Sequence, residues 1–178
     1  LVMTPGAPVK QALLDAGIST DVYSSYETSL YQPVYSIVAK NSNSKEQDRF
    51  VSVINDTLEK LVKDGINERT IEAGINYYEF KYREADFGPY PKGLMYYLTM
   101  MDSWLYDETK PFIHIEAGDT FDELKKNARN GYFEKLIKEY LLDNNHKSII
   151  SLVHEYGLEK EKEQKEAEKR AAFALRQE

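Results

Sequence analysis

The fold is decided by residues 21–40, which read DVYSSYETSLYQPVYSIVAK. In its second half, Val34, Ser36 and Val38 alternate with Tyr35, Ile37 and Ala39. β-Branched and aromatic side chains are frequent throughout, and such side chains suit a pleated, half-buried surface. The stretch therefore predicts two strands, near 21–28 and 33–40.

Helical patterns lie on both sides of this pair. Before it, Leu13 belongs to a short apolar repeat that closes at Gly17. After it, Ser44 and Gln47 have the spacing of a capping box, and an apolar stripe at helical intervals runs from there to Gly65. These patterns predict one short helix before the strands and one long helix after them.

Further helices follow along the chain. Asn67 is placed to cap the next one, which ends before the glycine- and proline-containing break at 87–91. A third helix follows that break. Thr120 and Glu123 form a second candidate capping box, with helices expected near 120–129 and 132–143. The pattern is an α+β fold, with helices packed on one face of a mostly antiparallel sheet.

The last part of the chain changes character at residue 155. Residues 146–154 are rich in isoleucine, leucine and valine and predict a strand that is covered on both faces. Residues 158–178 are rich in Glu, Lys and Ala, as in a solvated helix or the start of a charged helical linker. We therefore expect a domain over 1–154 and a linker from 155 to 178. Because Leu1–Met3 resemble the tail of an apolar element, we expect a fragment that begins partway through a domain.

Composition excludes several classes of partner and chemistry. The chain has 178 residues, of which 42% are hydrophobic, so it can bury a core. Its formal charge of -7 argues against nucleic acid and anionic membrane surfaces. It contains no cysteine, which removes disulfides and thiolate ligands and favours a reducing compartment. With neither a signal peptide nor a membrane span visible, we expect a cytoplasmic location.

The histidines do not form a zinc motif. The sequence has His114, His146 and His154, and none has a second histidine four residues away. His154–Glu155 begins such a motif, but Leu158 stands where the second histidine would be. A site built from His114, Glu116 and a distant third ligand is a weaker alternative, and a surface role for each histidine is the ordinary interpretation.

Tyrosines form the strongest candidate binding feature, with 14 in the chain. Tyr23, Tyr26 and Tyr35 fall in the predicted strand pair and are candidate contacts for a peptide, because tyrosine combines an apolar ring with a polar tip. An extended peptide could add to the strand edge near 33–40. The competing interpretation is a half-buried structural seam.

Several phrases along the chain resemble one family. Residues 72–84 read EAGINYYEFKYRE, residues 87–94 read FGPYPKGL, and residues 141–146 read LLDNNH. Two further phrases are WLYD at 104–107 and APVKQAL at 7–13. All five occur in the same order along zinc metallopeptidases of the insulinase type, and they resemble the presequence-protease branch of that family. The resemblance spans residues 4–155.

The resemblance implies an incomplete metallopeptidase-like domain. Such enzymes have four homologous α+β domains that close around unstructured peptides, with zinc held in the first domain. This chain is similar to the later part of the non-catalytic second domain, which contributes chamber wall and interdomain packing. The resemblance thus implies no catalytic, cofactor or metal residue here, zinc bound outside this segment, and partners in the other domains and the peptide substrates.

An alternative from another class is a stand-alone helical interaction module that binds a protein through its tyrosine-rich surface. An incomplete α+β domain leaves a sheet edge and apolar surface uncovered, so we also expect self-association.

Overall fold

The computed structural model describes residues 1–4, 6–85 and 87–174, and it confirms the predicted α+β class. The chain divides into two compact units, Leu1–Lys147 and Ser148–Glu178. The boundary expected at 154–155 stays a prediction. In the first unit the elements are α1 (Pro8–Asp15), β1 (Asp21–Glu27), β2 (Val34–Lys40), η1 (Ser44–Glu46), α2 (Gln47–Asp64), α3 (Glu68–Glu84), α4 (Lys92–Trp104), α5 (Gly118–Ala128), α6 (Tyr132–Leu136) and η2 (Ile137–Leu142), and the second unit contains α7 (Leu158–Ala174).

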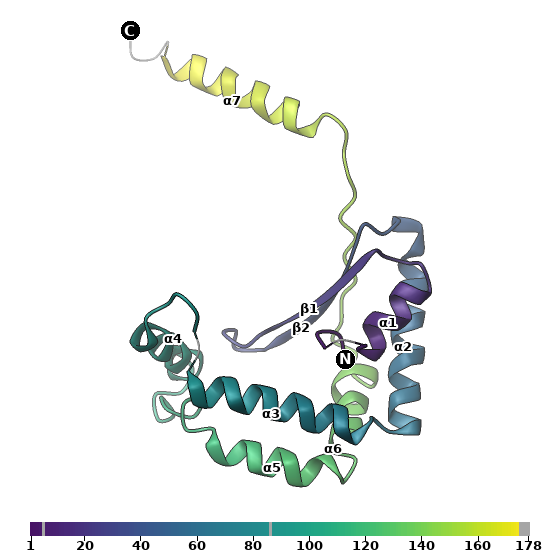
Figure 1. Ribbon diagram of the computed structural model, residues 1–178. Coiled ribbons are helices and arrows are strands. Elements are labelled where there is room, and N and C mark those ends of the chain that lie inside the picture. The colour runs from purple at the N-terminus through teal and green to yellow at the C-terminus, as the bar shows by residue number, and fades with distance from the viewer. Residues whose placement is uncertain (5, 86, 175–178) are drawn as a thin grey trace. The chain divides into compact units, whose positions relative to one another are not determined.

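The two predicted strands form an antiparallel hairpin. Asp21 pairs with Lys40 at its base and Glu27 with Val34 at its tip. The Ser19 hydroxyl closes the base, since its oxygen lies 2.6 Å from the carbonyl oxygens of both Asp21 and Lys40. Figure 1 shows the hairpin running from α1 and α2 toward α4.

The hydrophobic core lies at the base of the hairpin. Its buried residues include Val9 and Leu13 of α1, Val22 of β1, Leu58 of α2 and Ile137 of η2. The spacing of Val9 and Leu13 puts both side chains on the same face of α1. The apolar stripe predicted for α2 also faces this cluster, through the partly buried side chains of Phe50, Ile54 and Leu61 that surround Leu58.

A second pair of helices, α3 and α5, lies beside the core region (Figure 1). Ion pairs join the two helices, with the Lys125 ammonium on the Glu79 carboxylate and the Arg129 guanidinium 2.6 Å from Glu68. The Tyr82 and Phe121 rings also meet, with 5.4 Å between their centres. Polar contacts thus contribute much of this packing.

Helix starts differ from prediction at two places. Asn67 caps α3 as predicted, since its side chain accepts a hydrogen bond from the Thr70 N–H at 3.2 Å. Ser44 does not cap α2 as predicted. Instead, the Asn43 side chain accepts a hydrogen bond from the Lys45 N–H, and a short 3₁₀ turn leads into α2. The box predicted at Thr120 is also wrong: α5 already begins at Gly118, without a side-chain cap.

The predicted strand at 146–154 is wrong for the described residues, because that segment has no regular secondary structure and belongs to no sheet. In the second unit the Leu152 side chain is 97% exposed. A strand is stabilised by hydrogen bonds to a neighbouring strand, and no described strand pairs with this one. Apolar composition predicted a strand, but composition cannot supply the partner that a strand needs.

The charged tail forms a helix, as predicted. Helix α7 spans Leu158–Ala174, and its described side chains are exposed. The predicted continuation over residues 175–178 lies outside the described residues. Among the helices that the structure describes, none is long and apolar enough to cross a membrane.

Candidate functional site

The strand register separates the three candidate tyrosines. Tyr26 and Tyr35 stand directly opposite each other, so their side chains share one face of the hairpin. Tyr23 pairs with Val38 and lies at an odd offset from Tyr26, which places it on the other face. The structure thus brings two of the predicted residues together and separates the third.

Tyr26 and Tyr35 differ in their surroundings although they are paired. Tyr26 is 62% exposed, whereas Tyr35 is partly buried. Burial raises the pKa of the Tyr35 phenol, and a hydrogen bond with Ser24 opposes that rise. Tyr35 therefore stays a neutral donor and acceptor near neutral pH, beside a ring that projects into solvent.

Tyr23 has a cation as its neighbour. The Lys40 ammonium lies 4.8 Å from the centre of the Tyr23 ring, within the range of a cation–π contact. Tyr23 itself is 39% exposed. This contact restrains the ring near the base of the hairpin, so Tyr23 is less available for a peptide on the Tyr26 side.

The hairpin also offers backbone groups. Within the part of the chain that the structure describes, β1 pairs with β2 alone. Each strand therefore has one edge without a strand partner, where N–H and C=O groups point outward. An extended peptide can form hydrogen bonds to such an edge, and side chains on the Tyr26–Tyr35 face would contact alternate residues of that peptide.

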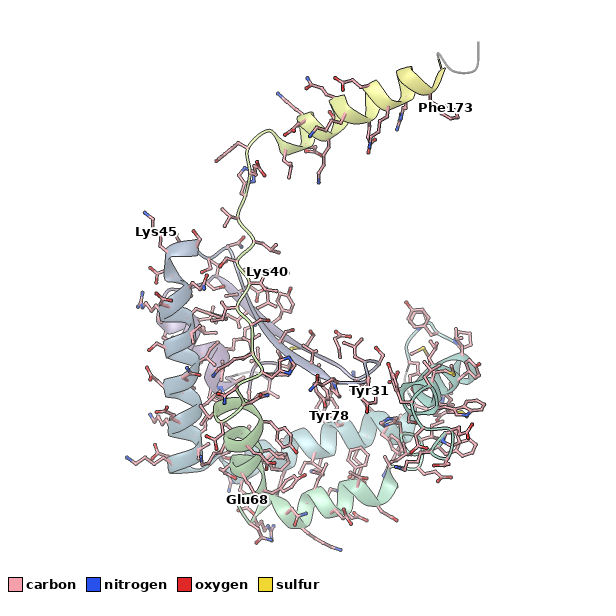
Figure 2. The ribbon with its side chains drawn as sticks, turned by 180° about the vertical axis from the view of Figure 1, so that it is seen from behind. Tyr31, Lys40, Lys45, Glu68, Tyr78 and Phe173 are labelled. Carbon is pink, nitrogen blue, oxygen red and sulfur yellow. The ribbon has the colours of Figure 1, made fainter. Side chains whose placement is uncertain are left out.

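The tip of the hairpin is anchored to α4. The Thr28 hydroxyl donates to the Asp102 carboxylate at 3.1 Å, and the Tyr106 hydroxyl donates to the Ser29 carbonyl at 2.9 Å. The Tyr31 ring, labelled in Figure 2, lies 5.5 Å from that of Tyr106. These contacts join residues that lie 74 and 77 positions apart in the sequence. Sequence reasoning missed them, because no local pattern pairs a turn with a distant helix end.

Large apolar side chains are exposed on α3, on α4 and in the turn between them. Tyr78 of α3, for example, extends from its helix in Figure 2. Large apolar side chains that gather on a protein surface often mark a place where a partner binds. We call this set the α3–α4 apolar surface; it consists of Tyr77, Tyr78, Phe80, Tyr90, Leu94, Tyr96, Tyr97 and Leu98.

The histidines show no metal-binding arrangement in the described residues. His114 and Glu116 lie in the loop between α4 and α5. Across residues 1–4, 6–85 and 87–174, no three His, Cys, Asp or Glu side chains gather closely enough to hold a metal ion. The described residues therefore do not fit a zinc site. They also provide no third ligand for the metal site considered at His114 and Glu116.

No family model matches this chain, but several known proteins are similar to it in sequence. The chain is 41% identical over 162 residues to Protein HypA of Clostridium perfringens, covering 91% of this chain and 16% of that protein. It is 30% identical over 154 residues to Presequence protease 1, chloroplastic/mitochondrial, of Arabidopsis thaliana, covering 84% of this chain and 14% of that protein.

A third relative extends the comparison. Presequence protease, mitochondrial, of Xenopus laevis is 24% identical over 180 residues, covering 95% of this chain and 16% of that protein. The chain thus spans less than one fifth of the length of each of these relatives. Over most of its own length, the chain is related to a segment of the presequence proteases, which are peptidases by name.

Proposed function

We propose that this chain is a non-catalytic segment of an insulinase-type zinc endopeptidase that degrades unstructured peptides. The observation that carries the proposal is the similarity to Presequence protease 1 over 84% of the chain. Because the described residues do not fit a zinc site, the proposal assigns zinc and the chemistry of cleavage to residues outside this segment.

The proposed contribution of the segment is chamber wall and interdomain packing. The α3–α4 apolar surface supports this role, since apolar and aromatic side chains concentrate where domains or subunits meet. Domains of the same polypeptide are the proposed partners. Contacts of this kind would bury Tyr78 and Leu94, which now face solvent.

Peptide contact is proposed for the hairpin. The paired rings of Tyr26 and Tyr35, next to a strand edge without a partner, offer both apolar contact and backbone hydrogen bonds. Tyr23 is assigned a smaller part, because it lies on the opposite face and contacts Lys40.

The test uses the full-length polypeptide that contains this segment. Cleavage of an unstructured fluorogenic peptide should stop when a chelator removes zinc and return when zinc is restored. Tyr26→Ala and Tyr35→Ala should each raise KM by about threefold to tenfold with little change in kcat, because they remove ground-state binding.

Two matched variants sharpen this test. Tyr26→Phe keeps the ring and should retain most of the affinity, whereas Tyr140→Ala removes an equally exposed tyrosine of η2 and should change nothing. An unchanged KM in both hairpin variants would contradict peptide contact there. Cleavage that persists without zinc would contradict the endopeptidase assignment itself.

The alternative function, a protein-interaction module, rests on the same α3–α4 apolar surface. It predicts a stable complex with a separate protein and no peptide cleavage by the full-length polypeptide. The zinc-dependent assay therefore distinguishes the two functions directly.

A further inference from the structure

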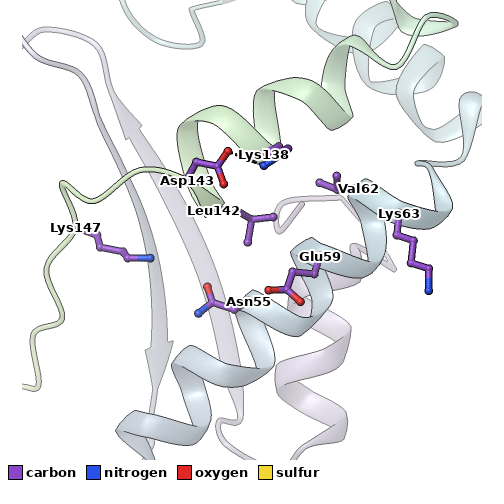
Figure 3. Close-up of a pocket in the computed structure, with 8 residues that line it drawn as sticks. All are labelled: Asn55, Glu59, Val62, Lys63, Lys138, Leu142, Asp143 and Lys147. Atoms are coloured by element: carbon purple, nitrogen blue, oxygen red, sulfur yellow. Dashed lines mark hydrogen bonds and ion pairs between the residues drawn. The ribbon is translucent and has the colours of Figure 1, made fainter.

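A pocket of about 370 Å³ lies between α2 and η2, apart from the hairpin tyrosines. Asn55, Glu59 and Val62 line it from α2, and Leu142 and Lys147 line it from the opposite side. Its volume lies at the lower end of the range for small-molecule sites. Figure 3 shows Leu142 between the two helices, with the polar groups of Asn55 and Glu59 beside it.

The widened turns of η2 shape one wall of the pocket. The Asp143 N–H donates to the Lys138 carbonyl at 2.8 Å, a bond that spans five residues. This π-type winding brings residues five apart onto nearly the same side of the helix, so the Lys138 ammonium reaches the Asp143 carboxylate at 2.7 Å. In an ordinary α-helix these two side chains would point in different directions. The pair neutralises itself and leaves the other polar groups to define the pocket.

Two opposite charges, both on exposed side chains, remain beside the half-buried side chains of Val62 and Leu142. Within the described residues, neither Glu59 nor Lys147 has an ion pair or side-chain hydrogen bond. In Figure 3 the Lys147 side chain extends toward Asn55, and the Glu59 carboxylate lies on the far side of that amide. A negative group, an amide and a positive group thus follow one another along the pocket, next to Val62 and Leu142.

We propose that this pocket binds a small zwitterion with an apolar side chain, of the free α-amino acid class. The ammonium group of the ligand would face Glu59, and its carboxylate would face Lys147 and the Asn55 amide. Its side chain would rest against Val62 and Leu142. This inference depends on the geometry of α2, η2 and Lys147, which follows η2, and not on the function proposed for the hairpin.

The test titrates the 178-residue chain, labelled with ¹⁵N, with L-leucine and two analogues that each lack one charge. Leucinamide keeps the ammonium group, and 4-methylpentanoate keeps the carboxylate. L-Leucine should give saturable shifts of the amide signals of residues that line the pocket, and each analogue should bind about fivefold more weakly, the scale of one exposed ion pair.

Charge-removing variants should separate the two contacts. Glu59→Gln should weaken binding of L-leucine and leucinamide about fivefold and leave 4-methylpentanoate unchanged. Lys147→Met should have the opposite pattern: it should weaken the binding of L-leucine and 4-methylpentanoate and leave the binding of leucinamide unchanged. Lys63→Met is the matched control, because Lys63 also lines the pocket but its ammonium points away from it in Figure 3.

Two outcomes would overturn the proposal. One is the absence of saturable shifts at the pocket in a chain whose spectrum is otherwise well dispersed. The other is a Glu59→Gln or Lys147→Met variant that binds all three ligands as the unchanged chain does, since binding would then not use these charges.

Discussion

The first unit contains two regions that handle apolar side chains in opposite ways. Around α1, β1 and α2, Leu13 and Val9 are completely buried. On α3 and α4, large apolar side chains are at least as numerous, yet α4 has no buried residue and α3 has only Ile75. Similar residues thus form a core in one region and a surface in the other.

The difference shows that apolar content does not decide burial. Helix α1 meets β1 and α2 at once, so its apolar face is covered from two sides. Helices α3 and α4 have fewer neighbours in the described chain. Ion pairs help to hold α3 to α5, and the Tyr82 hydroxyl holds α3 to the loop before α5. We expect hydrophobic burial to dominate stability in the first region and polar contacts to dominate it in the second.

The largest expected effect distinguishes the two regions directly. Leu13→Ala should lower the free energy of unfolding by about 3 kcal/mol, because it leaves a cavity at a fully buried position. Leu98→Ala in α4 is the matched control; its side chain is 49% exposed, and the loss should stay below about 1 kcal/mol. Urea denaturation measures both. Equal losses of unfolding free energy in the two variants would mean that α4 is packed as tightly as α1, and would contradict the difference between the two regions.

A smaller effect is expected for Tyr82→Phe in the second region. The Tyr82 hydroxyl donates to the Ile115 carbonyl and accepts from the Ala117 N–H at 2.9 Å. Its removal leaves two partly buried backbone groups unpaired, which should cost about 1–2 kcal/mol and speed hydrogen exchange at Ala117. Tyr78→Phe, at an exposed position, is the control and should leave both measurements unchanged. If the Ala117 amide stays fully protected from hydrogen exchange in Tyr82→Phe, the Tyr82 hydroxyl does not stabilise the loop.

The pH dependence of stability should depend on Glu79. Hydrogen bonds from Lys125 and then Arg83 lower the pKa of this carboxyl, whose side chain is only 13% exposed. A carboxyl with a lower pKa in the folded state adds stability that is complete above its unfolded pKa and is lost as pH falls through the folded value.

Glu79→Gln should therefore flatten the decline in stability below the ordinary pKa range of a glutamate. Thermal unfolding followed from neutral to acidic pH provides the measurement. An unchanged slope in Glu79→Gln would place the acid sensitivity elsewhere.

The weakest expected effect is self-association through the α3–α4 apolar surface. Uncovered apolar side chains should hold copies together at high concentration, and Leu94→Lys should reduce that association by placing a charge on the surface. Light scattering coupled to size-exclusion chromatography distinguishes the states. A clean monomer at every concentration would contradict the prediction.

Local patterns predicted much of the fold correctly. Alternating β-branched and aromatic residues located β1 and β2, and Asn67 marked the start of α3, because these signals act within a few residues of backbone. The same kind of reasoning failed at residues 146–154. Those residues have the composition of a strand, but a strand also needs a neighbour, and composition says nothing of where a neighbour lies.

The candidate site was predicted by residue but not by geometry. Tyr23, Tyr26 and Tyr35 could be named from composition, yet only the register showed that Tyr26 and Tyr35 share a face. Their role in binding a peptide stays a prediction. The anchor between Ser29 and Tyr106 had no signal in the sequence, since it joins a turn to the end of a helix far along the chain.

The sequence by itself determined the class of the fold and most of its helices and strands, because backbone preference and apolar periodicity are local properties. It also carried the similarity to the presequence proteases. Only the tertiary structure decided which apolar faces are covered, which tyrosines stand together, and that Glu59 and Lys147 line the same pocket. Those outcomes depend on contacts between residues distant in sequence, which form only when the whole chain has packed.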